Sequence, residues 1–349
     1  MAGTPTPRFT SEDLFRKHGQ PQARDIQQDA LGDCFFVASL GAIADQQPSR
    51  IKDMIQYDPK TETFSVTLHK DEGGKIKPVK LEITQAELED NLKRQGGSTV
   101  DNRKTGDSPI WPAVIETAFA KLNDSDPKVE GLKEGYNVIA AGGKARNAML
   151  TLTGSKGEDI SNATAQSIGV DKTLERIDKA LMDGRPVTLS TDPEKAGAAQ
   201  DGLVDNHVYT VERMYKNQAG DVMVDLRNPW TNNSNVGEGK DNPSPIMTVK
   251  FNDILKDQGF EYFNIGPEVK TPAKTLGEKA GAQIDALLGS LGDPGSFKEA
   301  LKGLAGSPDG QAFHAEGKQQ AQDQQSKQAA PQQPDTVEVA EKAQAGRRM

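Results

Sequence analysis

The sequence has little of several residue types that define common protein classes. It contains one cysteine in 349 residues, which excludes an internal disulfide framework and argues against a cysteine-rich zinc site. Aromatic residues make up 5% and hydrophobic residues 34% of the chain, so part of it has too few apolar side chains to form a core. A single free thiol fits a reducing compartment.

Dense basic clusters, membrane-length apolar runs and a secretory signal are also missing. The net charge is −9, and Lys and Arg do not gather enough to follow a phosphate backbone, so nucleic acid is not an expected partner. No apolar run reaches the length of a membrane span, and the first fifteen residues lack a signal-peptide core. We expect a cytoplasmic protein without membrane contact, while export through another N-terminal address stays open.

The two ends of the chain are predicted to lie outside the folded core. Residues 1–25 are interpreted as a flexible lead-in with one short helix at Glu12–Lys17. Residues 269–310 carry two apolar stripes at helical spacing, which predict short amphipathic helices that dock on another protein, dock on the cleft itself or pack on the core. Residues 311–349 are rich in Gln, Ala and Pro, which predicts a disordered tail.

Between these ends the pattern changes from helical to β-rich. Residues 26–160 contain apolar residues at helical spacing and one hairpin signal, and they predict a mostly helical lobe. Residues 161–268 contain a helix and then several β-rich runs separated by turn signals, which predict an antiparallel sheet or open barrel. The expected fold class is therefore α+β, with a cleft between the two lobes.

The only cysteine, Cys34, follows Gly32 and Asp33 in the segment QDALGDCFFVASLGAIAD. Gly32 permits a sharp turn, and Asp33 is a favourable N-cap residue for the helix predicted by the apolar spacing that follows. Cys34 then lies in the first helical turn, where backbone N–H groups stabilise a thiolate, although the charge of Asp33 opposes this. The alternative is an inert, buried cysteine.

A cysteine nucleophile needs a base, and elimination among the four histidines favours His207. His207 opens the β-rich run HVYTVERMY, next to a polar turn. The others lie in the lead-in, at a hairpin strand end among charges, and in the Gln-rich tail: His18, His69 and His314. A structural or surface role for His207 is the alternative.

The next β-rich run, DVMVDLRNPW, ends at Asn228, and neighbouring antiparallel strands can bring Asn228 close to His207. As the third member of a Cys-His-Asn set, Asn228 would orient the imidazole without adding a full charge. Its alternative interpretation is a turn former before Pro229. Asp225 lies on the same run, and strand alternation predicts that it points to the opposite face from Asn228.

Three segments, QDALGDC, NHVYTV and LRNPW, resemble the three catalytic boxes of calpain-family cysteine proteases, in the family's order. IWPAVIETAFAKLN is similar to the family's central helix, AAGG to its cleft glycines, and MTVKFNDIL to a late strand and helix. The resemblance covers roughly residues 20–266 and implies a papain-like, two-lobed cysteine protease core. No EF-hand loop is present in the sequence, so the calcium-sensing domain of animal calpains is not expected.

The resemblance implies a role for each matching residue. Cys34 would be the nucleophile, His207 the base and then the acid, and Asn228 the residue that orients His207. Gln28, with the Cys34 backbone N–H, would stabilise the oxyanion. Trp230 would cover the His–Asn hydrogen bond.

Other positions either match the family's substrate cleft or depart from its pattern. Gly142 and Gly143 would expose backbone groups to an extended substrate. Phe35 stands where the family usually has tryptophan, and Asn206 and Thr231 stand where glycine is common.

The predicted function is hydrolysis of peptide bonds in extended or unfolded protein segments, through a thioester. No cofactor is required. Calcium stays open, because the acidic segments near Asp124–Glu130 and Glu238–Asp241 are equally well interpreted as solvated turns. Two alternatives remain: transglutaminase-type acyl transfer, which usually has aspartate as third residue, and a protease-like binding module.

Overall fold

The computed structural model describes most of the first 269 residues, in the ranges 9–15, 19–28, 30–94, 108–125, 130–192, 203–233, 243–256 and 259–269. The described residues belong to one compact unit, which ends at residue 269. Val269 aside, the amphipathic helices predicted for residues 269–310 and the tail predicted for residues 311–349 lie outside the described residues.

Along the chain, the described residues form first helices, then a mixture of helices and strands, and then mainly strands. The helices are α1 (Ser11–Phe15), η2 (Ala23–Asp25), α2 (Cys34–Gln46), α3 (Pro48–Met54), α4 (Gln85–Lys93), α5 (Trp111–Asn123), η4 (Glu130–Leu132), α6 (Lys133–Ala140), α7 (Ala145–Thr153), α8 (Asn162–Ile168), α9 (Val170–Met182) and α10 (Phe251–Lys256). The strands are β1 (Ile55–Asp58), β2 (Thr63–Glu72), β3 (Lys75–Ile83), β4 (Glu158–Ser161), β5 (Val187–Thr191), β6 (Val208–Lys216), β7 (Val222–Arg227), β8 (Ile246–Lys250) and β9 (Phe260–Ile265).

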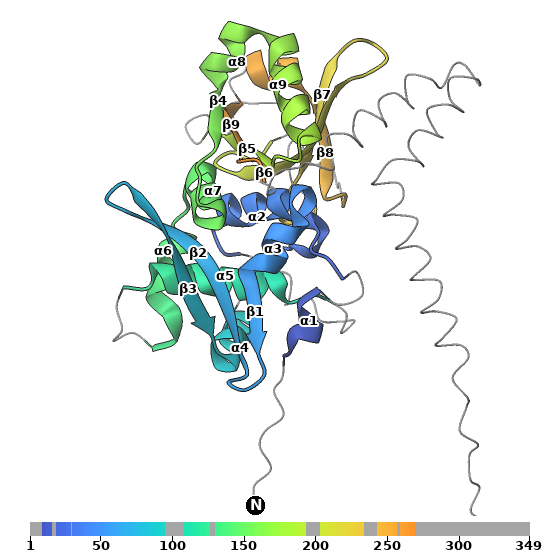
Figure 1. Cartoon of the computed structure of the whole chain (residues 1–349). Coiled ribbons are helices and arrows are strands. Elements are labelled where there is room, and N and C mark those ends of the chain that lie inside the picture. The colour runs from blue at the N-terminus through green and yellow to red at the C-terminus, as the bar shows by residue number, and fades with distance from the viewer. Residues whose placement is uncertain are drawn as a thin grey trace, which may run out of the picture. The chain divides into compact units, whose positions relative to one another are not determined.

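The strands form two antiparallel sheets. The first has the order β1-β2-β3, and the second has the order β4-β9-β5-β6-β7-β8. Figure 1 shows α2 and α7 between the two sheets, where α2 packs on β5 and β6 and α7 packs on β2. The predicted α+β class is confirmed, but strands β1 and β4 and helices α3, α4, α6 and α8 were not predicted, because each is short and is stabilised mainly by its neighbours in space.

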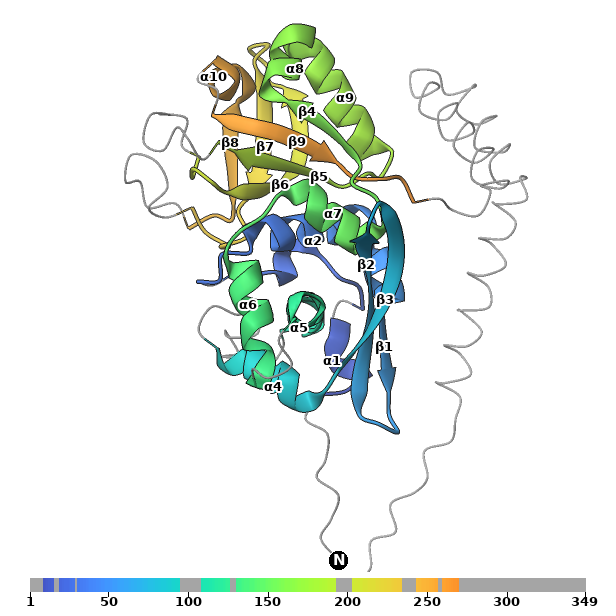
Figure 2. The ribbon, with the colours of Figure 1, turned by 90° about the vertical axis from the view of Figure 1, so that its left-hand side faces the viewer.

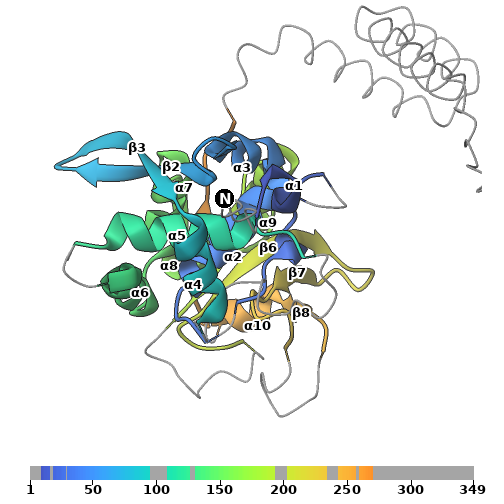
Figure 3. The same ribbon diagram turned by 90° about the horizontal axis from the view of Figure 1, so that it is seen from below.

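Two hydrophobic clusters form the core, and α2 belongs to the first of them. The first is built around α5, whose residues from Trp111 to Ala120 are all buried. Figures 2 and 3 show α5 with α1, α4 and α6 around it. The second cluster lies between the six-stranded sheet and the helices α8, α9 and α10. The helix α2 therefore has apolar neighbours on several sides, which explains why nearly all its residues are buried.

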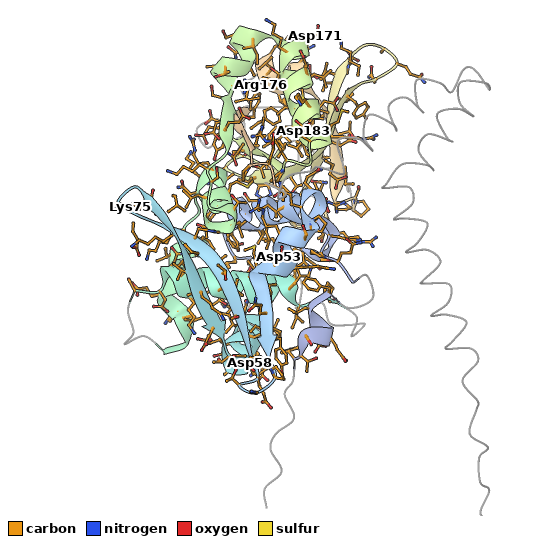
Figure 4. All side chains as sticks on the ribbon, in the orientation of Figure 1. Asp53, Asp58, Lys75, Asp171, Arg176 and Asp183 are labelled. Carbon is orange, nitrogen blue, oxygen red and sulfur yellow. The ribbon has the colours of Figure 1, made fainter. Side chains whose placement is uncertain are left out.

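Charged side chains lie on the outside of both halves. Figure 4 labels examples on α3, the β2–β3 hairpin and α9. Several form exposed ion pairs, such as Lys179 with Asp183 at 2.7 Å and Lys216 with Asp171 at 2.9 Å. Exposed pairs of this kind contribute little to stability. Among the described residues, no helix combines the length and apolar character that a membrane crossing requires.

Hydrogen bonds link α2 to the six-stranded sheet. Thr210 Oγ1 on β6 donates to the carbonyl of Ala38 in the middle of α2, at 2.8 Å, and both residues are buried. At the end of the helix, Gln47 Nε2 donates to the carbonyls of Gly184 and Pro267, at 3.0 and 2.8 Å. These hydrogen bonds consequently hold α2 at a defined place relative to the six-stranded sheet.

We expect Thr210→Val to lower stability by about 1 kcal/mol, because the near-isosteric change leaves the buried Ala38 carbonyl without this donor. Urea unfolding of the full chain measures the change. Thr67→Val, at a partly exposed site in β2, is the control and should cost less. Equal losses of stability in the two variants would show that the hydrogen bond from Thr210 to Ala38 does not stabilise the fold.

Candidate active site

Cys34 is the first residue of α2, and its side chain is half-buried. Asp33 occupies the N-cap position, as predicted, but its side chain makes no capping hydrogen bond. Burial first, and then the carboxylate of Asp33 wherever it is ionised, raises the pKa of the thiol to about 11, although the backbone N–H groups of Val208 and Phe35 oppose the shift by hydrogen bonding to the sulfur. The thiol is therefore neutral at pH 7, in contact with the start of β6.

His207 directly precedes β6 and is 3% exposed. Its backbone N–H donates to Thr191 Oγ1 at 2.8 Å, and its carbonyl accepts from the Thr191 N–H at 2.9 Å. The Tyr209 ring meets the imidazole edge-on, with 4.9 Å between ring centroids. Burial lowers the pKa of His207 to about 4, against the opposing effect of its hydrogen bond to Asn228. The imidazole is neutral in this cleft.

Asn228 is fully buried, and its side-chain oxygen lies 3.0 Å from His207 Nε2. The same oxygen accepts the backbone N–H of Trp230 at 3.1 Å, while Asn228 Nδ2 donates to Asn233 Oδ1 at 3.1 Å. Because a backbone N–H can only donate, the atom facing His207 is the amide oxygen. His207 Nε2 therefore carries the hydrogen, and Nδ1 is free to accept a proton.

Asn233 orients the Asn228 amide, and the sequence analysis missed it. Its Nδ2 donates to the carbonyl of Ser244 at 2.8 Å, so its own oxygen is directed at Asn228. Asn233 is 2% exposed, which is unusual for an asparagine in a loop. Its location in the polar stretch TNNSN gave no signal that would separate it from its neighbours.

Trp230 lies over His207, with 4.4 Å between ring centroids and 41° between ring planes. The preceding residue, Pro229, accepts the backbone N–H of Gln28 at 2.7 Å. The turn that carries Asn228 and Trp230 is therefore joined to the segment that leads into α2.

Asn206 and Thr231 occupy positions where the family commonly has glycine. Both have left-handed backbone angles, with φ of 51° and 60°. Glycine adopts such angles without strain, which explains its use at these two positions in the family pattern. Asparagine tolerates them, but a β-branched residue such as Thr231 does so only at a cost. The turn after Trp230 consequently holds a strained residue, fixed in part by the Thr231 N–H, which donates to the Asn228 carbonyl at 3.0 Å.

A cavity of about 590 Å³ opens beside the thiol. It is lined by six of the seven predicted site residues, Gln28, Cys34, Gly142, Gly143, His207 and Trp230, and Asn228 is buried next to His207. The structure thus brings the segments QDALGDC, NHVYTV and LRNPW to one place.

The two cleft glycines differ in their surroundings. Gly142 has a φ of 85° and open space where a side chain would lie. A side chain at Gly143 would come within 2.6 Å of the Phe35 ring, so close packing explains that glycine. Their predicted contact with substrate backbone stays a prediction.

Gln28 lines the cavity, but its amide hydrogens are used within its own loop. Its Nε2 donates to the Leu31 carbonyl at 2.6 Å and to Asp33 Oδ1 at 3.2 Å. Its Oε1 has no hydrogen-bond partner among the described residues. To stabilise an oxyanion, Gln28 would first have to release one of these hydrogens.

The sequence analysis also missed polar residues along the cavity wall. Glu261 has no paired residue on β5, because the register shifts between Ser190–Tyr262 and Thr191–Phe260. Such a bulge redirects a side chain, and the Glu261 carboxylate binds Lys144 Nζ with both oxygens at 2.7 Å. Only strand register reveals this arrangement.

Asp225 does not add to the site, and most of the two acidic segments lies outside the described residues. The Asp225 carboxylate accepts from Arg213 Nε and, at 2.6 Å, from Thr248 Oγ1. In the two acidic segments, residues 126–129 and 238–241 lie outside the described residues. The described ranges contain no group of three His, Cys, Asp or Glu side chains that could hold a metal ion.

The lowered pKa of His207 predicts a pH-dependent stability. The folded state holds His207 neutral down to about pH 4, whereas the unfolded state binds a proton near pH 6.5. Stability should therefore fall as the pH drops through this window, by about 2–3 kcal/mol from this group. We expect the loss between pH 7.5 and 4.5, measured by urea unfolding, to be smaller by that amount in His207→Gln. An equal loss in both proteins would contradict a buried, neutral imidazole.

Comparison with known proteins adds independent information about this chain. The family model described as calpain family cysteine protease matches residues 6–252. Calpain-type cysteine protease DEK1 of Arabidopsis thaliana is 25% identical over 243 residues, which are 68% of this chain and 10% of that protein. Calpain-13 of Rattus norvegicus is 26% identical over 216 residues, which are 60% of this chain and 29% of that protein.

These relatives are much longer proteins, because the chain spans between about a tenth and 29% of their lengths. The family match nevertheless covers more than half of the chain, from the lead-in to the end of β8, and includes Cys34, His207 and Asn228. The chain belongs to the calpain family of cysteine proteases.

Proposed function

We propose that this chain is a cysteine endopeptidase in which Cys34 is the nucleophile, His207 the proton carrier and Asn228 the residue that orients His207. The observation that carries the proposal is the 3.0 Å hydrogen bond between His207 Nε2 and Asn228 Oδ1, at a cavity that Cys34 also lines. It leaves the Nδ1 of His207 unprotonated, as a base requires.

The reaction follows from these protonation states. The sulfur of Cys34 attacks the substrate carbonyl while His207 Nδ1 takes the thiol proton, and the Asn228 oxygen stabilises the imidazolium that forms. The C–N bond then breaks, His207 gives its proton to the leaving amine, and the acyl group remains on sulfur. Water attacks this thioester and gives a proton to His207, the C–S bond then breaks to release the carboxylic product, and His207 returns the proton to the sulfur.

The surroundings of the triad support these steps. Trp230 covers the imidazole and limits access of water to the His207–Asn228 bond, which strengthens that bond. Val208 and Phe35 direct backbone N–H groups at the sulfur, which favour the thiolate during attack. No step requires a metal ion or cofactor.

We further propose that the substrates are extended or unfolded protein segments. Gly142 lines the cavity with open space above its backbone, which leaves room for a peptide main chain. Acyl transfer with Asp225 as the orienting residue is the weaker alternative, because the Asp225 carboxylate is occupied by Arg213 and Thr248.

Replacement of the only cysteine tests the proposal directly. We expect the wild-type chain to cleave a denatured protein and to incorporate one thiol-directed epoxide, and Cys34→Ala to do neither while unfolding at a similar temperature. The assays are run with calcium and with a chelator, and with a primary amine to detect acyl transfer. Residual cleavage by the purified Cys34→Ala protein would sink the cysteine-protease assignment.

A pair of variants on β7 and its end tests the third residue. We expect Asn228→Ala to lower kcat by at least about tenfold, because His207 loses the acceptor that fixes its tautomer. Asp225→Ala should reduce stability, since Arg213 and Thr248 lose their shared partner, and should leave the rate per active site within about threefold. Epoxide titration counts the active sites. The reverse result, with both proteins folded, would make Asp225 the orienting residue.

A further inference from the structure

Two buried carboxyl groups meet behind the nucleophile. Asp33, just before Cys34, is 0% exposed, and Glu116, in the middle of α5, is 1% exposed. The two side chains hydrogen-bond to each other. Because neither ionised carboxylate can donate, the pair must share a proton, and it carries one negative charge instead of two.

The shared proton is expected on Asp33. Burial first, then the charge of Glu116 and the hydrogen bond to it, raises the pKa of Asp33 well above its usual value. Within Asp33, Oδ1 accepts from Gln28, whereas Oδ2 receives no N–H or O–H donor from the described residues, so Oδ2 is the Asp33 oxygen that can carry the proton. Two further groups face the pair: Tyr136 on α6, near Glu116, and Arg94 after α4, whose guanidinium lies over the Tyr136 ring.

The other oxygen of Asp33 controls Gln28. Gln28 Nε2 donates to the Leu31 carbonyl at 2.6 Å and, less closely, to Asp33 Oδ1 at 3.2 Å. The longer bond is the one that an oxyanion in the cleft could replace. A neutral carboxyl is a weaker acceptor than a carboxylate, so a protonated Asp33 releases the Gln28 hydrogen more readily than an ionised one.

We propose that Glu116 is a positioning residue for peptide hydrolysis, which keeps the proton on Asp33 so that Gln28 can turn an amide N–H from Asp33 to the oxyanion. The inference rests on the proposed function. It assigns a role to a carboxyl group on α5, which lies in the core and does not line the cavity. It also explains why Asp33 is turned inward and does not cap α2.

The proposal predicts an alkaline loss of turnover. When the pair loses its proton, the ionised Asp33 holds the Gln28 hydrogen and adds a negative charge beside the thiol. The oxyanion then loses a donor, which lowers kcat, whereas ground-state binding of the substrate is unaffected and KM stays constant.

Glu116→Gln moves this loss to lower pH. The variant removes the charge of Glu116, which raises the pKa of Asp33, so Asp33 ionises at lower pH than in the wild-type chain. We expect the alkaline midpoint of kcat to fall by at least about half a pH unit, with KM within about twofold. In the double variant Asp33→Asn/Glu116→Gln, residue 33 cannot ionise, and the midpoint should return to the wild-type value or above.

Tyr136→Phe is the matched control, because it removes a hydroxyl near Glu116 and keeps both carboxyl groups. Its midpoint should equal that of the wild-type chain. Epoxide titration and thermal unfolding of every variant give the fraction of folded sites. If Glu116→Gln does not fold, Asp33→Asn alone gives the same test, with the midpoint expected to rise.

The outcomes separate this inference from the proposed function. A wild-type chain that hydrolyses peptides, with an unmoved midpoint in Glu116→Gln, contradicts the role of Glu116 alone. A double variant that keeps the lowered midpoint contradicts it as well, because the effect would not pass through Asp33. A folded wild-type chain without hydrolysis contradicts both proposals.

Discussion

The contact between the first turn of α2 and the first residues of β6 is the constraint on which the site depends. The thiol of Cys34 accepts the backbone N–H of Val208, and the middle of α2 is joined to β6 by the bond from Thr210 to Ala38. The helix belongs to the first hydrophobic cluster, whereas β6 contributes Val208 to that cluster and its other buried apolar residues to the second. Packing of the two clusters therefore determines whether the sulfur and the imidazole can react.

Much of the fold and of the candidate site could be predicted because the relevant signals are local. The helix after Cys34, the β2–β3 hairpin and the strands from β5 to β9 each follow from apolar spacing and turn residues within a short segment. His207 was reached by elimination, and Asn228 by the rule that successive antiparallel strands meet, which the pairing of β6 with β7 bears out. These inferences needed no knowledge of distant contacts.

The rest depends on contacts between distant segments. Asp33 has every local feature of a helix cap, yet its side chain is buried and hydrogen-bonds to Glu116, far along the chain. Glu261 faces the cavity because of a shift in strand register, and Asn233 orients Asn228 through a loop. A buried carboxyl, a bulge and an amide network leave no mark on composition or periodicity, because each is stable only in the assembled core.

The dipeptide Asn228–Pro229 has a consequence for the lifetime of the protein. Asparagine ages by deamidation, in which the nitrogen of the next residue attacks the side-chain amide and forms a cyclic imide. That nitrogen must carry a hydrogen, and proline has none. The side-chain amide of Asn228, whose oxygen accepts the His207 hydrogen, is thereby protected from slow conversion to a carboxylate. Such a conversion would place a negative charge, fully buried, beside an imidazole that the fold keeps neutral.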